Sequence, residues 1–359
     1  MKAILRPPAE VLYARELEAL IKYDSGKKPE GWKLSPGAVL TFILGGDAGG
    51  VSVTPKYIGS RGLIETAVAT LLTDRALLLL GEPGTAKSRV SECLAAAISG
   101  DSGKLVQGTA GTTEEHLRYT WNYAMLIASG PSEQALVKGP VMRAMETGAL
   151  ARVEELTRCP GEVQDALISI LSEQGVAVPE LGVTVPARRG FALIATANSR
   201  DRGVFSMSSA LMRRFNVVTL PPPPTIEAEA AIVSVRVNEL ARGCALAAGG
   251  ADAEAVGRVV RVFRELRSGA TLENDFKLKP IESGVSAADA ISSVMSGLAL
   301  AQAFGDGGLN DGYMAAGLQS ALARDADSAL IWTEYIENVM KKRGGEWAGL
   351  YEACRKANT

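Results

Sequence analysis

The first two thirds of the chain alternate short unbroken apolar runs with stretches of helical spacing. Residues 76–80 are all apolar, which is typical of a strand buried on both faces of a parallel sheet. Residues 89–99 follow with apolar side chains near helical spacing. Further strands are predicted at 104–107, 149–153, 191–198 and 217–220, of which 149–153 and 191–198 are mostly apolar. The pattern therefore predicts an α/β fold built on a parallel sheet.

Helical spacing also appears between the strand candidates and throughout the last third of the chain. Within the α/β part we expect helices at 61–72, 114–126, 137–145 and 163–173. Gly130 and Pro131 interrupt this pattern, which indicates an insertion within a helix over about 120–137. Two short alternating runs around 179–182 predict a hairpin at 176–185.

Pro221 to Pro224 mark a domain boundary, because consecutive prolines cannot continue a central strand or a helix. After them, only helices are predicted, at 226–246, 256–266, 287–303, 313–324 and 328–341. Before the first strand, residues 9–21 predict a helix and 24–31 a loop. We therefore expect an N-terminal extension (1–50), an α/β core (51–220) and an all-helical domain (221–359).

The loop after the first strand carries the clearest chemistry. With the first residue of the helix it comprises Gly81, Glu82, Pro83, Gly84, Thr85, Ala86, Lys87, Ser88 and Arg89. Strand, glycine-rich loop, Lys-Ser and helix in this order predict a phosphate-binding loop, whose N–H groups point into one concavity. Lys87 is expected to reach the β- and γ-phosphates of ATP or ADP, and Ser88 to bind Mg²⁺. Ala86 replaces the second glycine of the pattern, so its methyl group is expected to weaken binding. The alternative is an ordinary strand-turn-helix with a chance Lys-Ser pair.

Two acids end the strand at 149–153, where the carboxyl ends of parallel strands face the phosphate crevice. Glu154 is expected to contact Mg²⁺ through a water molecule, and Glu155 is expected to act as general base on the attacking water. Asn198, at the end of another strand, is a candidate to hold that water or the γ-phosphate. Taken alone, the two acids could equally be a solvated pair. Ile58 and Gly59 are candidates to clamp adenine, with simple packing as the alternative.

The composition of the chain argues against several classes of function. The 359 residues carry a net charge of −2, so the overall charge gives no reason to expect a nucleic acid or an anionic membrane as a partner. None of the four cysteines lies close to another, and His116 is the only histidine, which argues against a redox pair or a histidine metal site. The N-terminus lacks the apolar stretch of a signal peptide, and we expect no membrane span and a cytoplasmic location.

Six motifs together resemble AAA+ ATPases and, within them, the MoxR branch, over about residues 55–300. They are Gly-Glu-Pro-Gly-Thr-Ala-Lys-Ser (81–88), Lys-Gly-Pro-Val-Met (138–142), Val-Glu-Glu (153–155), Val-Gln-Asp-Ala-Leu (163–167), Ala-Thr-Ala-Asn (195–198) and Arg-Arg-Phe (213–215). The resemblance implies an αβα ATPase core with a helical lid. It also implies a homo-oligomeric ring, usually a hexamer, with ATP between subunits and a von Willebrand factor A domain protein as partner.

The resemblance also implies roles for individual residues. Lys87 and Ser88 match Walker A, Glu154 and Glu155 match Walker B, and Asn198 matches sensor 1. Arg214 matches the arginine finger that acts on the ATP of a neighbouring subunit. The insertion near 120–137 and the hairpin at 176–185 match two β-hairpin insertions that line the ring.

Three departures from the family pattern bear on turnover. Glu154 stands in place of the Walker B aspartate, and Glu154→Asp is expected to leave activity equal or higher because it restores the family's acid. Arg213 precedes Arg214 where the family has aspartate, so either arginine could be the finger. Ala288 stands where a sensor 2 arginine is usual, so hydrolysis is expected to be slow.

Three functions remain in view. The first is a ring-forming ATPase that remodels or matures a partner protein, and the second is a nucleotide-controlled scaffold with slow or vestigial hydrolysis. A small-molecule phosphotransferase is disfavoured by the helical lid and by the Arg213-Arg214 pair.

Overall fold

The computed structural model describes residues 6–198, 205–246, 251–272, 276–281 and 284–358. Contacts between residues divide the chain into two compact units, Pro7–Pro221 and a C-terminal unit that begins at Pro222. The division falls within the run of four prolines, which supply no N–H donor to extend the last strand of the first unit.

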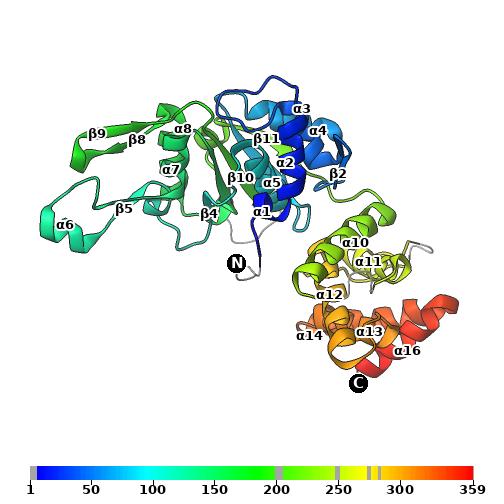
Figure 1. Ribbon diagram of the computed structural model, residues 1–359. Helices are drawn as coiled ribbons and strands as arrows, with labels where there is room; N and C mark the ends of the chain where they lie inside the picture. The colour runs from blue at the N-terminus through cyan, green and yellow to red at the C-terminus, as the bar shows by residue number, and fades with distance from the viewer. Residues whose placement is uncertain (1–5, 199–204, 247–250, 273–275, 282–283, 359) are drawn as a thin grey trace. The chain divides into compact units, whose positions relative to one another are not determined.

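A five-stranded sheet forms the centre of the first unit (Figure 1). Its strand order is β11-β3-β10-β7-β4, and every recorded pairing is parallel. In chain order the strands are β3 (Ala76–Gly81), β4 (Leu105–Gln107), β7 (Leu150–Glu154), β10 (Ala192–Asn198) and β11 (Phe215–Thr219). The α/β fold with a parallel sheet is thereby confirmed, together with its helical C-terminal region.

The sheet separates two hydrophobic cores. Successive residues of a strand point to opposite faces, so Leu77 and Leu79 enter one core while Ala76 and Leu78 enter the other. The first core is closed by α4 (Arg61–Thr70) and α5 (Lys87–Ser99), and the second by α7 (Pro140–Thr147), α8 (Gly161–Glu173) and the short α9 (Ser209–Met212). Both faces of β3 are therefore buried, as its unbroken apolar run predicts.

Residues 7–50, expected as an extension, pack on the first core of the same unit. They form α1 (Ala9–Leu12), α2 (Ala14–Tyr23), α3 (Pro36–Leu44) and the first strand of a small hairpin, β1 (Gly46–Ala48) with β2 (Val51–Val53). The buried ammonium of Lys56 holds them in place. It lies 4.2 Å from the ring centroid of Tyr13 and 4.3 Å from that of Phe42, and it pairs with Glu16. Cation–π contacts of this kind strengthen when they are desolvated.

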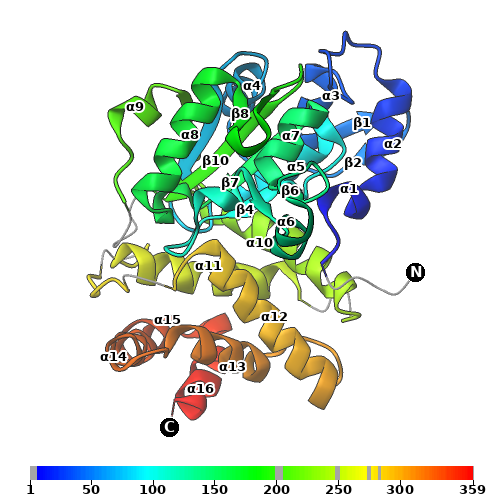
Figure 2. The same cartoon turned by 90° about the vertical axis from the view of Figure 1, so that its left-hand side faces the viewer.

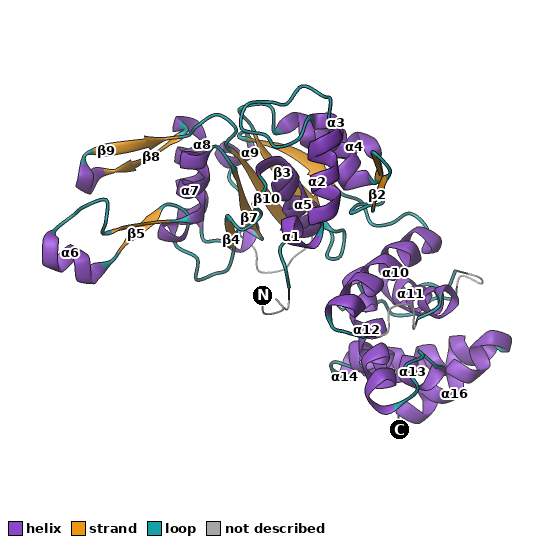
Figure 3. Cartoon of the chain, in the orientation of Figure 1, coloured by secondary structure: helices purple, strands orange, loops and turns teal. Residues whose placement is uncertain are grey.

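Two arms project from the first unit (Figure 3). The helix predicted at 114–126 is wrong: after the short turn η1 (Glu114–His116), β5 (Tyr119–Trp121) pairs with β6 (Leu136–Lys138), and α6 (Tyr123–Ser129) lies between them. The predicted hairpin is confirmed as β8 (Gly175–Val178) and β9 (Val183–Pro186), joined by η3 (Pro179–Leu181). Glu180 links the arms, because its carboxylate accepts hydrogen bonds from Tyr119 Oη (3.0 Å) and Trp121 Nε1 (3.4 Å).

Apart from an isolated β-bridge between Ala270 and Lys277, the regular structure of the second unit is helical in the described residues (Figure 2). Its elements are α10 (Ile226–Gly243), α11 (Ala253–Ser268), α12 (Ala287–Phe304), α13 (Asp311–Leu322), α14 (Ala326–Tyr335), the π-helical turn η4 (Ile336–Met340), α15 (Lys341–Arg343), η5 (Gly345–Trp347) and α16 (Ala348–Ala357). The predictions did not include α16. Helix α12 has the length and apolarity of a membrane span, but Ala290, Val294 and Leu298 pack it into the unit's own core.

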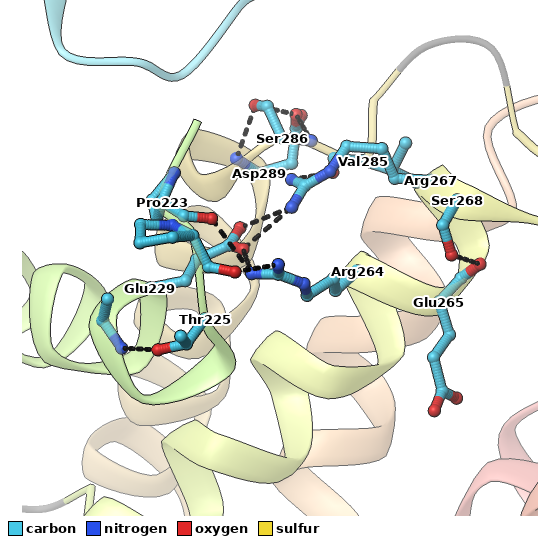
Figure 4. Close-up of polar contacts among 12 residues, drawn as sticks. Pro223, Thr225, Glu229, Arg264, Glu265, Arg267, Ser268, Val285, Ser286 and Asp289 are labelled. Atoms are coloured by element: carbon cyan, nitrogen blue, oxygen red, sulfur yellow. Dashed lines mark hydrogen bonds and ion pairs between the residues drawn. The ribbon is translucent and has the colours of Figure 1, made fainter. Parts of the chain in front are cut away.

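A fully buried carboxylate fixes the start of this second unit (Figure 4). Glu229 Oε2, on α10, lies 2.8 Å from Arg267 Nη2 and 3.4 Å from Arg264 Nη1, both on α11. The Arg264 guanidinium also donates to the carbonyls of Pro223 (3.1 Å) and Pro224 (2.7 Å). These bonds tie the proline segment to the helices that follow it.

Glu229→Gln should lower the free energy of unfolding of the second unit by about 2 kcal/mol. The amide keeps the size of the side chain but removes the charge that two arginines share. Denaturant unfolding should show this loss, whereas Glu227→Gln, on an exposed position of the same helix, should have little effect. Equal stability of the two variants would contradict a structural role for the buried charge.

Candidate functional site

The loop between β3 and α5 has the backbone geometry of a phosphate cradle. Gly84 and Ala86 both adopt left-handed conformations, with φ of +82° and +64°. The latter is unusual for a residue with a Cβ atom and stores backbone strain. Gly81 has no room for a side chain, because a Cβ atom there would lie 2.5 Å from Thr85 Oγ1 and 2.7 Å from the carbonyl oxygen of Leu220.

Lys87 begins helix α5 and turns its side chain back into the loop. Its Nζ donates to the carbonyl oxygens of Gly81 (3.0 Å) and Glu82 (2.8 Å), and the residue is only 7% exposed. An ammonium held at this point can exchange these carbonyls for phosphate oxygens without leaving the loop.

The carboxylate of Glu154, at the end of β7, accepts four hydrogen bonds. Its Oε2 accepts from Ser88 Oγ (2.7 Å) and Thr196 Oγ1 (2.6 Å). Its Oε1 accepts from Ser91 Oγ and Arg152 Nη2, each at 2.8 Å. Burial by itself would raise the pKa of Glu154, but the Arg152 charge and the three hydroxyl donors together hold that pKa below its ordinary value. The carboxylate therefore stays ionised.

Arg152 is a buried partner of this site that the predictions missed. It lies on β7, is 5% exposed, and donates to Ser91 Oγ (2.8 Å) and to the carbonyl oxygens of Ser102 (3.0 Å) and Ser88 (3.2 Å). A signal was present in the sequence, since an arginine inside an apolar strand requires a buried acid or several carbonyls as partners.

Glu155 follows Glu154 in a left-handed conformation, with φ of +57°, which turns the two carboxylates apart. Its Oε2 accepts from Asn198 Nδ2 (3.2 Å) and lies 3.0 Å from Arg158 Nε. Thr196 Oγ1 accepts from the backbone N–H of Glu155 (3.1 Å) while it donates to Glu154. The structure thus brings Ser88, both acids and Asn198 into one hydrogen-bonded chain.

The oxygen atoms of Ser88 and Glu154 are suitable ligands for a magnesium ion. A hydroxyl and a carboxylate oxygen lie 2.7 Å apart, and both are the hard oxygen ligands that Mg²⁺ prefers. In the parts of the chain that the structure describes, no three His, Cys, Asp or Glu side chains gather into a metal cluster.

Arg213 and Arg214 lie at a second place, a cavity of about 320 Å³ next to β3 and α8. Its lining residues are Asp74, Arg75, Leu171, Ser172, Arg213 and Arg214. Arg214 is anchored, because its Nε donates to Ser172 Oγ (2.7 Å) and its Nη1 to the Ala210 carbonyl (2.6 Å). Arg75, which the predictions did not single out, donates to the carbonyl oxygen of Arg213.

Three other residues were predicted to bind the nucleotide: Ile58, Gly59 and Arg89. Gly59 lies close to the Tyr57 ring, since a Cβ atom on Gly59 would meet the Tyr57 hydroxyl at 2.5 Å. Ile58 is half-buried. Arg89 donates to the hydroxyl of Tyr13 and lies 5.0 Å from that ring's centroid. The helix of the phosphate loop is therefore in direct contact with the N-terminal segment.

Comparisons with known proteins agree with this geometry. The family of AAA domains of the dynein-related subfamily matches residues 76–215, from the first residue of β3 to the first of β11. The uncharacterized protein YehL of Escherichia coli (strain K12) is 46% identical over 266 residues, which cover 73% of this chain and 73% of that protein. The uncharacterized protein SH1500 of Staphylococcus haemolyticus (strain JCSC1435) is 26% identical over 165 residues, or 45% of this chain and 62% of its own.

Two solved structures are also similar to the chain. NtrX from Brucella abortus in complex with ADP is 14% identical with a TM-score of 0.47, over 83% of this chain and 67% of its own. A single-residue variant of RuvB from Thermotoga maritima is 16% identical with a TM-score of 0.43, over 81% of this chain and 80% of its own. On the strength of the YehL match and the AAA domain, the chain belongs to the family of YehL within the AAA+ ATPases.

Proposed function

We propose that the protein is a ring-forming ATPase of MoxR type that couples ATP binding and hydrolysis to the remodelling or maturation of a partner protein in the cytoplasm. One observation carries the proposal: Thr196 Oγ1 joins the two acids, donating to the Glu154 carboxylate and accepting from the Glu155 N–H. The group that would face a metal is thereby linked to the group that would face water.

Each residue of the chain has a distinct task in this proposal. Lys87 neutralises phosphate charge, and Ser88 with Glu154 would hold Mg²⁺, which would screen the phosphates. Glu155 accepts a proton from the attacking water, and the amide of Asn198 keeps its carboxylate in place. Arg158 pairs with the same carboxylate oxygen as Asn198 and helps to hold it in place.

Arg214 would act in a neighbouring subunit, and this is why the proposal includes a ring. A guanidinium from outside the site stabilises the charge on the transferred phosphoryl group. Arg75, Arg213 and Arg214 gather at one cavity, which supports an anion-binding role there. The anchoring of Arg214 by Ser172 favours it over Arg213 as the finger.

The two arms are proposed to contact the partner, for which a von Willebrand factor A domain protein is the candidate. Tyr123 and Ile127 on α6 are 64% and 87% exposed, and α6 buries none of its residues. Exposed apolar side chains at the tip of an arm are suited to a protein contact. Because Glu180 links the arms, both would respond to a change at either one.

A nucleotide-controlled scaffold is the second candidate, and the Arg152–Glu154 pair favours it. The guanidinium already balances the charge of Glu154, so less negative charge remains for a metal ion. Ala288, at the start of α12, supplies no cation to the phosphates. Both features agree with slow hydrolysis in an assembly whose nucleotide-bound form matters more than its turnover.

Glu155→Gln should bind ATP with unchanged affinity while its hydrolysis falls by about 10²–10⁴-fold, because the amide keeps the size of the side chain but cannot accept the proton. Nucleotide binding by calorimetry and steady-state phosphate release measure the two effects separately. Lys87→Ala, which should lose binding itself, is the matched comparison. Normal turnover of Glu155→Gln would exclude Glu155 as the base.

Glu154→Asp should lower hydrolysis at least about tenfold and destabilise the fold by about 1–3 kcal/mol, contrary to the expectation from the family pattern. The shorter side chain cannot reach Ser88 and Arg152 together, so a buried guanidinium loses part of its charge partner. Phosphate release and denaturant unfolding test this against Glu162→Asp, the same change on the surface of α8. Activity equal to or above that of the wild type would show that the extra methylene is dispensable.

Arg214→Ala subunits mixed with Lys87→Ala subunits should recover part of the ATPase activity that each lacks alone. A mixed ring contains some sites with an intact Lys87 on one side and an intact Arg214 on the other. Phosphate release is measured on rings that native mass spectrometry shows to be mixed, and Arg213→Ala is tested in the same way. Mixed rings without recovered activity would rule out action across the subunit boundary.

A further inference from the structure

A cavity of about 620 Å³ in the second unit has the size of a small-molecule site. It is formed by α11, the π-helical turn η4, α15 and the corner that η5 makes before α16. Its lining residues are Arg261, Thr271, Phe276, Asn338, Val339, Lys342, Arg343, Gly344, Gly345, Glu346 and Trp347. All of them belong to the second unit, whereas the phosphate loop belongs to the first.

One side of the cavity is a charged network that is almost completely buried. The Arg343 side chain is 7% exposed, and its Nη2 lies 2.6 Å from Glu265 Oε1, which is fully buried. Its Nη1 donates to Tyr335 Oη at 3.0 Å, and Tyr335 Oη in turn donates to Glu265 Oε2 at 2.6 Å. These bonds hold the guanidinium in a fixed orientation, which a free surface arginine lacks.

The balance of charge at the cavity is positive. Arg261 Nε lies 3.8 Å from the same Glu265 Oε1, so two guanidinium groups share one carboxylate. Lys342 adds a third cation, and Glu346 is the single acid among the lining residues that the structure describes. An anion entering the cavity would therefore meet net positive charge at a partly desolvated position, where electrostatic attraction is strongest.

Aromatic rings accompany the cations. Lys342 Nζ lies 5.4 Å from the Phe276 ring centroid, and the Arg343 guanidinium lies 4.6 Å from that of Trp347. Trp347 is buried, whereas Phe276 is 37% exposed and presents an apolar surface at the cavity. A flat apolar group of a ligand could pack against this ring while its anionic group meets the cations.

The backbone around the cavity departs from regular helix at two adjacent places. The five-residue π-helical turn η4 contributes Asn338 and Val339 to the lining, and such turns are frequent at functional sites. Gly344 and Gly345 then follow with φ of +61° and +53°, and a Cβ atom on either would meet no atom within 4 Å. The positive φ favours glycine at both positions, and the corner stays open.

We propose that this cavity binds an organic anion in which a carboxylate or phosphate group is joined to a flat apolar ring. Lys342 and Arg343 bind the anionic group, and Phe276 packs against the ring. The second unit would thereby bind a small molecule at a site of its own.

The test uses the full-length protein with excess ADP, which occupies the phosphate loop, and two probes, 1-naphthyl phosphate and 1-naphthoate. Binding is followed by calorimetry and by the fluorescence of the naphthyl group. We expect saturable binding of at least one probe below about 1 mM, at least about tenfold tighter than that of inorganic phosphate or acetate. Which probe binds more tightly distinguishes a phosphate site from a carboxylate site.

Lys342→Glu should weaken binding of the preferred probe by at least about tenfold, because it replaces a charge-assisted contact by a repulsive one. Lys341→Glu is the matched control, with the same change of charge in the neighbouring residue, which does not line the cavity. Equal affinity in wild type and Lys342→Glu, equal losses in the two variants, or no saturable binding of either probe would overturn the proposal. So would displacement of the probe by raising the ADP concentration, since the probe would then occupy the nucleotide site.

Discussion

The buried carboxylate of Glu154 is the interaction on which the ATPase core depends. Four donors from three elements meet on its two oxygens: Ser88 and Ser91 from α5, Arg152 from β7 and Thr196 from β10. A carboxylate that is 3% exposed would be costly without them. With them, it fixes the helix of the phosphate loop against the two strands that carry the other site residues. The position of Ser88 is therefore set by the acid that would share its metal ion.

Buried acids are paired with arginine in the second unit as well, each with two arginines instead of one. Glu229 holds Arg264 and Arg267, and Glu265 holds Arg343 with Arg261 nearby. Such groups are expensive to desolvate, and apolar residues of similar volume are often at least as stabilising. Their value lies in orientation, because a guanidinium with two or more fixed partners points in one direction. Arg264 uses this to hold the proline segment, and Arg343 to present a cation at the cavity.

Local patterns predicted the strands of the parallel sheet and the phosphate loop because each of them is encoded by consecutive residues. A strand buried on both faces must be apolar throughout, and a phosphate cradle needs its glycines, Lys87 and Ser88 in order. The prediction of a helix at 114–126 failed because Tyr119–Trp121 pairs with a strand that begins 15 residues after it ends, a contact that helical spacing cannot reveal. The three-arginine cavity was hidden for the same reason: Arg75 and Arg214 are 139 residues apart, and only the pairing of β3 with β11 brings them together.

Arg152 alters the interpretation of the glutamate at position 154. Compared with the aspartate of the family pattern, Glu154 has a side chain that is one methylene longer. In the structure, that extra length lets one oxygen reach Ser88 while the other reaches Arg152, and neither contact displaces the next residue, Glu155, from Asn198. The substitution and the buried arginine are therefore best understood as one unit, in which the arginine anchors the longer side chain. Under the proposed function, such a site would keep the geometry for nucleotide binding while it lowers the negative charge offered to a metal ion. Nucleotide binding and turnover would then be separable properties of the same loop.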